Sequence, residues 1–211
     1  MYWSDANLIK ILKNNGVIVM PTDTIYGIVG RADESSVINR IYNIRKRASD
    51  KPCIILIGDI SELEKFSIKL SREQKKVTNK YWPGSFRQKH TFSQSPASQR
   101  QHSKKYVSAS QPMSIIFSCE SGKFKYLHRG TNTLAFRLPA SEELRKLLKN
   151  TGPLVAPSAN TEGLPPARNI REAENYFGNA IDLYVDGGEL TGKSSKLIKL
   201  HKDGTESIIR E

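Results

Sequence analysis

The chain has 211 residues, of which 37% are hydrophobic and 26% are charged, and its formal net charge is +12. These values are typical of a globular chain that buries a sizeable core, and they exclude an intrinsically disordered protein. No apolar run approaches the roughly 20 residues of a membrane-spanning helix, and the N-terminal segment has no secretory signal, so we expect a cytoplasmic protein without a membrane partner. The two cysteines are too few for a disulfide framework, and no Cys/His cluster has the spacing of a fixed metal site.

Apolar periodicity predicts alternating helices and strands from the N-terminus onward. A helix over 8–12 follows Ser4, a capping residue type, and Gly16 ends this pattern before a strand at 17–20. A second helix is predicted over 37–44, and the uninterrupted apolar run 53–57 predicts a strand that is covered on both faces. Further strands are expected at 114–118, 133–138, 154–156, 183–185 and 197–200, and further helices at 142–149 and 170–177. This order predicts a single α/β domain over 1–211 with a mixed sheet.

Residues 85–111 interrupt this pattern. The segment holds seven Ser, five Gln and five Lys or Arg among its 27 residues, with no acidic residue and no sustained apolar period. Such a composition predicts a disordered loop, because too few apolar groups are present to offset the entropy cost of ordering. A basic arm that touches RNA is the alternative. Without this segment the net charge falls from +12 to +7, so the total charge is weak evidence for RNA binding.

Three polar segments, each next to a predicted strand, indicate a ligand site. PTDTIYG at 21–27 directly follows the first strand and forms either a hydroxyl-stabilised turn or a ligand-binding loop. The cations of RKRASDKP at 45–52 either stabilise the end of the preceding helix or clamp a polyphosphate. PSAN at 157–160 either caps a turn or presents hydroxyl and amide groups to a nucleotide. We expect the three segments to converge on one edge of the sheet, and this coincidence is the strongest indication of an active site.

Taken in order, five motifs resemble the YrdC/Sua5 family, the threonylcarbamoyl-adenylate synthases. They are PTDTIYG, the R-x-R-x-x-x-K-P run, YWPG at 81–84, TLAFRLP at 133–139 and PSAN. The resemblance covers nearly the whole chain outside 85–111, and removing that segment joins YWPG to PMSIIF, as in the uninterrupted family motif. It implies a YrdC/RibB-like twisted open mixed sheet flanked by helices, in the short single-domain form.

The resemblance also implies a reaction. L-threonine, bicarbonate and ATP would give threonylcarbamoyl-AMP and pyrophosphate, the first step towards threonylcarbamoyladenosine in tRNA. Mg²⁺ would arrive with ATP rather than at a fixed protein site, and no covalent enzyme nucleophile would be needed, so positioning and cations would carry catalysis. The implied recipient of the product is a tRNA threonylcarbamoyl transferase complex, and direct contact with tRNA or double-stranded RNA stays open.

Carried over position by position, the resemblance assigns roles to ten residues. Threonine would be bound by Thr24, Arg137 and Ser195, with Arg137 on the carboxylate. ATP would be held by Arg45, Arg47, Lys51, Thr133, Ser158, Asn160 and Arg210.

Three positions depart from the family pattern, and two other functions stay open. Arg45 stands where the family usually has Lys, Lys196 stands where many members have Thr, and Glu162 stands where Ser is common. A non-catalytic factor that binds double-stranded RNA or assists ribosome assembly is the alternative function. A nucleotide-binding regulator with an inactive site is a third.

Overall fold

The structure, a computed structural model, describes residues 2–48, 51–83 and 112–211. Its strands are β1 (Ile18–Pro21), β2 (Tyr26–Arg31), β3 (Ile54–Leu56), β4 (Met113–Ser118), β5 (Thr133–Arg137), β6 (Leu154–Val155), β7 (Leu183–Tyr184), β8 (Lys196–Leu200) and β9 (Glu206–Arg210). Its α-helices are α1 (Ala6–Lys13), α2 (Ser35–Arg45), α3 (Arg72–Tyr81), α4 (Lys125–His128), α5 (Glu142–Thr151) and α6 (Ile170–Phe177). Four 3₁₀ segments complete this part of the chain: η1 (Tyr2–Ser4), η2 (Ile60–Phe66), η3 (Gly122–Phe124) and η4 (Gly178–Ala180).

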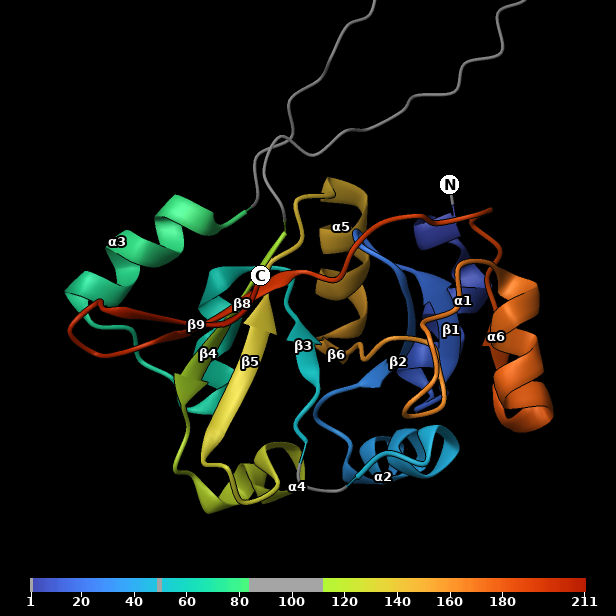
Figure 1. The fold of residues 1–211 in the computed structure, drawn as a ribbon, viewed down its shortest axis with the longest axis horizontal. Coiled ribbons are helices and arrows are strands. Elements are labelled where there is room, and N and C mark those ends of the chain that lie inside the picture. Colours follow the sequence, from blue (N-terminus) through green and yellow to red (C-terminus); the bar gives the residue numbers. More distant parts are fainter. Residues whose placement is uncertain (1, 49–50, 84–111) are drawn as a thin grey trace, which may run out of the picture.

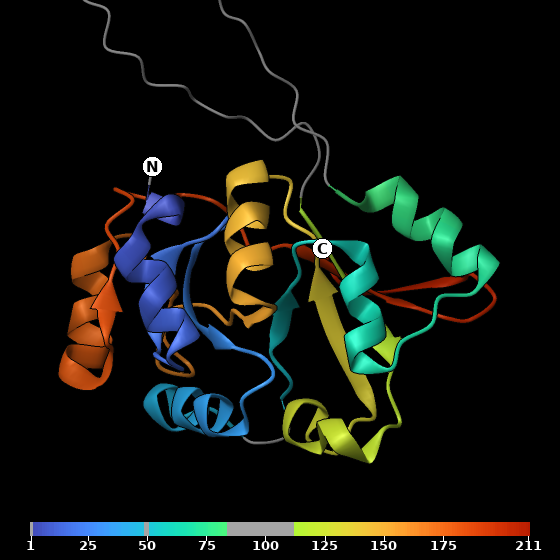
Figure 2. The same cartoon turned by 180° about the vertical axis from the view of Figure 1, so that it is seen from behind.

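The strands form one mixed sheet with the order β7-β1-β2-β6-β3-β5-β4-β8-β9. The pairs β1–β7, β3–β5 and β4–β8 are parallel, and the other neighbours are antiparallel. Figures 1 and 2 show this twisted layer with α1 and α6 near the β7 edge, α3 beside the β8–β9 hairpin, and α2 and α4 together at one end. The prediction of a twisted open mixed sheet flanked by helices is therefore confirmed.

The short strand β3 shows how the centre of the sheet is buried on both faces. Ile55 and Leu56 are both fully buried, but they belong to different apolar clusters because successive side chains of a strand point to opposite faces. Leu56 packs in the cluster that includes the apolar faces of α1 and α5, whereas Ile55 packs in the cluster that includes α2 and η2. The continuous apolar run at 53–57 thus predicted its surroundings correctly.

Several local predictions need correction. Asp5, not Ser4, caps α1: its carboxylate accepts a hydrogen bond from the backbone N–H of Leu8 at 2.9 Å. The residues after PTDT form β2, which pairs with β1 as an antiparallel hairpin and was missed because Gly27 and Gly30 interrupt its apolar run. Helix α3 was also missed, since few of its residues are apolar, although its capping box between Ser71 and Gln74 was a readable start signal.

Two further predictions concern segments rather than single elements. The segment 85–111 lies outside the described residues. Among the residues that are described, no helix is long and apolar enough to cross a membrane.

Candidate functional site

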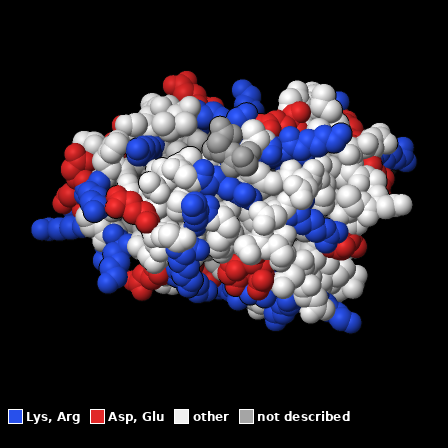
Figure 3. Space-filling model, turned by 90° about the horizontal axis from the view of Figure 1, so that it is seen from below, with Lys and Arg blue, Asp and Glu red and all other residues white. Residues whose placement is uncertain are grey.

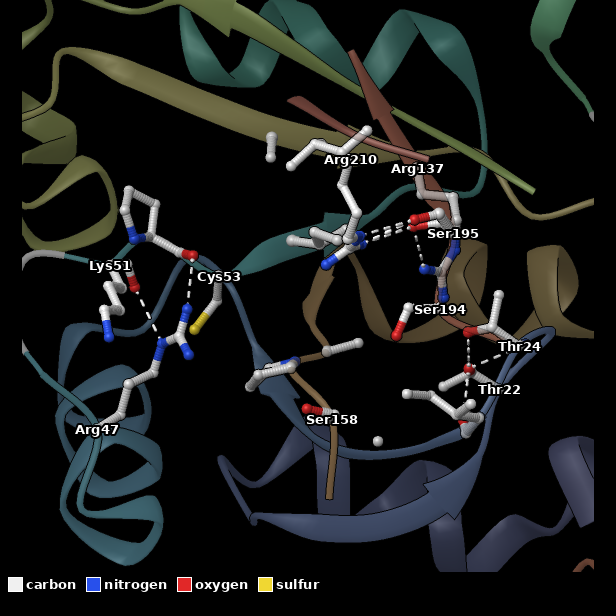
Figure 4. Close-up of a pocket in the computed structure, with 18 of the residues that line it drawn as sticks. Thr22, Thr24, Arg47, Lys51, Cys53, Arg137, Ser158, Ser194, Ser195 and Arg210 are labelled. Atoms are coloured by element: carbon white, nitrogen blue, oxygen red, sulfur yellow. Dashed lines mark hydrogen bonds between the residues drawn. The ribbon is translucent and has the colours of Figure 1, made fainter. Parts of the chain in front are cut away.

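A pocket of about 420 Å³ lies where the three polar segments meet. Its walls come from the β1–β2 turn, the loop between α2 and β3, strand β5, the loop after β6, and the strands β8 and β9 (Figure 4). The segment 45–52 precedes β3 rather than following a strand, and it reaches the pocket because β3 runs antiparallel to β6, which sets the start of β3 beside the end of β6. The convergence itself is confirmed.

Strand β5 forms part of the floor through alternate side chains. Thr133, Ala135 and Arg137 line the pocket, whereas Leu134 and Phe136 lie in the hydrophobic core on the opposite face. This division follows from the two-residue period of a strand. It also explains how two of the predicted site residues, four positions apart, reach the same cavity.

At one end of the pocket, Arg137 is held in a buried ion pair. Its Nη2 donates to Oδ1 of Asp23 at 2.9 Å, and the two side chains are only 5% and 4% exposed. Its Nη1 lies 3.5 Å from the hydroxyl of Ser195, while its Nε has no hydrogen-bond partner. Asp23 belongs to PTDT but was not among the predicted site residues, since sequence cannot show which side chain faces the arginine.

Side chains from β4, β5 and β9 contact Ser195 at this end of the pocket. Arg210 donates from Nε and Nη2 to the Ser195 carbonyl at 3.0 and 2.8 Å, as the dashed lines in Figure 4 show. The Ser195 hydroxyl is 2.8 Å from that of Ser114 on β4. Burial, followed by the nearby positive charge of Arg137, lowers the pKa of Arg210. Two guanidinium groups and one carboxylate therefore share this end, which leaves a net positive charge.

Thr24 lines the pocket from the β1–β2 turn. Its hydroxyl lies 3.0 Å from that of Thr22, and the Thr22 hydroxyl donates to the carbonyl of Ile25 at 2.7 Å. The hydroxyl-stabilised turn is thus present, and its residue Thr24 also lines the pocket, while ligand binding by this loop stays a prediction.

At the other end, Arg45 connects α2 to the loop after β6. Its Nε donates to the carbonyl of Asn160 at 3.0 Å, and its Nη2 donates to the Asn160 side-chain oxygen at 3.1 Å and to the Ser158 hydroxyl at 3.3 Å. Arg45 is only 2% exposed, and Nη1 has no hydrogen-bond partner. Burial, then repulsion from Arg47, lowers the pKa of Arg45 to about 10, so the side chain stays cationic at neutral pH.

Arg47 and Lys51 lie at the mouth of the same end. Arg47 donates from Nε to the carbonyl of Lys51 at 3.0 Å and from Nη2 to the carbonyl of Pro52 at 3.2 Å. The ammonium of Lys51 donates to Glu162 at 2.7 Å. Figure 4 shows Arg47, Lys51 and Cys53 grouped across the cavity from Arg137 and Arg210. The segment 45–52 therefore supplies cations to the pocket rather than only stabilising a helix end.

The structure brings the ten predicted residues together. All of them except Asn160 line the pocket, and Asn160 lies behind it as a partner of Arg45. Their ligand contacts stay predictions. The sequence interpretation missed Asp23, Ser114, Thr131 and Ser194. Within the described ranges, no group of three or more His, Cys, Asp or Glu side chains could hold a metal ion.

Known proteins resemble this chain over most of its length. The Sua5/YciO/YrdC family model, described as telomere recombination, matches residues 10–88 and 85–211. The chain belongs to this family. Its relatives include proteins named threonylcarbamoyl-AMP synthase from Pyrococcus abyssi, 27% identical over 94% of this chain and 51% of the relative, and from Bacillus subtilis, 26% identical over 87% and 46%. The chain thus spans about half the length of these curated relatives.

Solved structures of family members share the fold. A variant of Sua5 from P. abyssi superposes with a TM-score of 0.72 and is 25% identical, with 92% of this chain and 49% of that chain covered. YciO from E. coli gives a TM-score of 0.71 at 20% identity, with 97% of this chain and 87% of that chain covered. The predicted membership of the YrdC/Sua5 family is confirmed.

Proposed function

We propose that this family member is an L-threonylcarbamoyladenylate synthase. The observation that carries the proposal is the two-ended pocket, with Arg137, Arg210 and Thr24 at one end and Arg45, Arg47 and Lys51 at the other. The relatives named threonylcarbamoyl-AMP synthase support it. A Sua5 structure from P. abyssi described as complexed with L-threonine has the same fold at a TM-score of 0.72.

The Arg137 end suits the carboxylate of L-threonine. A buried guanidinium already fixed by Asp23 needs no rearrangement to offer its remaining N–H groups to a second carboxylate. The negative charge of Asp23 offsets the charge of Arg137. Arg210 adds a second positive charge, so this end keeps a net positive charge that attracts an anion. The nearby hydroxyls of Thr24 and Ser195 supply hydrogen-bonding groups of the kind that a hydroxyl-bearing amino acid requires.

The Arg45 end suits the triphosphate of ATP. Three cations from one short segment face a single cavity, and the unpartnered Nη1 of Arg45 is a buried donor without an acceptor. Ser158, which accepts a hydrogen bond from Arg45, and Thr133 also line the pocket and would offer polar groups to the nucleoside. Asn160 fixes Arg45 and so acts behind the pocket.

The reaction would then run along the pocket. Threonine and bicarbonate condense to a carbamate with loss of water, and a carbamate oxygen attacks the α-phosphorus as the bond to pyrophosphate breaks. The residues of this chain orient the two reactants and neutralise the charge that develops on the phosphates. The pocket is lined by cations and hydroxyls rather than by carboxylates, so Mg²⁺ would be held by the phosphates of ATP.

The product is a labile mixed anhydride, so a tRNA threonylcarbamoyl transferase complex in the cytoplasm would have to consume it. The non-catalytic RNA-binding alternative is not favoured, because the curated relatives carry the name of an enzyme. The face at the α2–α4 end shows Lys and Arg interspersed with Asp, Glu and uncharged residues, rather than one continuous basic stripe (Figure 3).

Pyrophosphate release by the purified chain tests the proposal directly. The assay contains ATP and Mg²⁺, with and without L-threonine and bicarbonate. Release that requires both small substrates is the expected result. ATP binding without any release would refute synthase activity and favour a nucleotide-binding regulator.

A further inference from the structure

The carboxylate of Glu162, from the loop after β6, lies against the cationic segment at the phosphate end of the pocket. Its Oε1 accepts a hydrogen bond from the ammonium of Lys51 at 2.7 Å, and its Oε2 accepts one from the backbone N–H of Ala48. The backbone N–H of Glu162 itself donates to the carbonyl of Arg45 at 2.9 Å. Glu162 is therefore attached to the cationic segment at three points.

The groups that Glu162 engages are those that bind phosphoryl oxygens. An ammonium and a backbone N–H that converge on two oxygens of one anion form a small anion-binding site. The hydrogen bond from Lys51, followed by that from Ala48, lowers the pKa of Glu162, so its carboxylate is charged at neutral pH. A carboxylate of the chain thus occupies donors that a phosphate group would use.

We propose that Glu162 is an internal competitor for the polyphosphate of the nucleotide. It holds the ammonium of Lys51 at the rim, so ATP or pyrophosphate must displace it to gain the lysine. This inference rests on the proposed function, in which Lys51 binds phosphates. Glu162 thereby lowers the affinity of the site for ATP and for the departing pyrophosphate. It lowers the affinity for AMP, which has a single phosphate, much less.

Equilibrium binding to three ligands tests the competition. Calorimetric titration measures the affinity of wild-type protein, Glu162→Gln and Glu142→Gln for pyrophosphate, ATP and AMP. Glutamine keeps an oxygen that can accept from Lys51 but removes the charge. Glu142 is the matched control, because it pairs with Lys146 at 2.9 Å on the exposed surface of α5. Glu162→Gln should bind pyrophosphate and ATP about two- to fivefold tighter, the range expected when an exposed ion pair no longer competes. AMP binding and the Glu142→Gln variant should match the wild type.

A second background separates competition for the lysine from general repulsion of anions. In Lys51→Met protein, the increase in pyrophosphate affinity caused by Glu162→Gln should be clearly smaller than in the wild type. An equal gain in both backgrounds, or weaker pyrophosphate binding by Glu162→Gln, would overturn the inference and leave the proposed function standing. Wild-type protein that binds neither pyrophosphate nor ATP would overturn both.

Discussion

Replacing Asp23 by alanine would leave Arg137 buried without its anionic partner. The two side chains are 4% and 5% exposed and 2.9 Å apart, so little solvent reaches the position of the lost carboxylate. Breaking such a buried pair by removing one partner costs about 3–5 kcal/mol, because it leaves an uncompensated charge in a poorly solvated site. For a chain of this size the melting temperature should fall by roughly 6–20 °C.

The control is Asp33→Ala, which removes an exposed partner of Arg31. The Asp33 side chain is 54% exposed, so this pair should contribute less than about 1 kcal/mol. Urea unfolding of both variants beside the wild type measures the two free energies. If Asp23→Ala destabilises no more than Asp33→Ala, the buried pair does not have the energetic role derived from its geometry.

Asp23→Asn tests the functional consequence of the same pair. Asparagine keeps an acceptor for Arg137 but removes the negative charge, which weakens the interaction by about 1–1.5 kcal/mol. Since Arg137 is then held less firmly, the KM for L-threonine should rise by roughly tenfold while the KM for ATP changes little. A rise confined to the KM for ATP would contradict the assignment of the Asp23–Arg137 pair to the threonine-binding end of the pocket.

Three further predictions concern the phosphate end, the core and the pH dependence of stability. Arg47→Ala should raise the KM for ATP in the pyrophosphate assay and leave that for threonine nearly unchanged, and the reverse pattern would contradict the assignment. Leu12→Ala, which truncates a fully buried side chain of α1, should lower the free energy of unfolding by about 2–5 kcal/mol in urea titrations. The hydrogen bond from Arg40 lowers the pKa of Asp182, so this carboxylate stabilises the fold above the ordinary pKa of aspartate, about 4, and the contribution is lost as the pH falls through its lower folded value. The stability advantage of wild type over Asp182→Asn should therefore be larger at pH 7 than at pH 3, and an advantage that does not shrink on acidification would contradict this sign.

The elements with strong apolar patterns could be predicted from sequence, and those with weak patterns could not. The run 53–57 predicted a strand buried on both faces because every one of its residues is apolar. Helix α3 gave no comparable signal, since its exposed surface is large and its single buried stripe is narrow. Strand β2 was missed because Gly27 and Gly30, which have low strand propensity, interrupt its apolar residues.

The sequence by itself determined the alternation of helices and strands, the family, and the residue types that form the pocket, because these depend on local order and on motifs read along the chain. Only the tertiary structure decided that Asp23 pairs with Arg137, 114 positions away, and that Glu162 holds Lys51, 111 positions away. Contacts of this kind depend on which way each side chain points after the sheet has assembled. The sequence does not show the partner of either carboxylate, and packing alone places Asp23 beside the buried arginine and Glu162 beside Lys51.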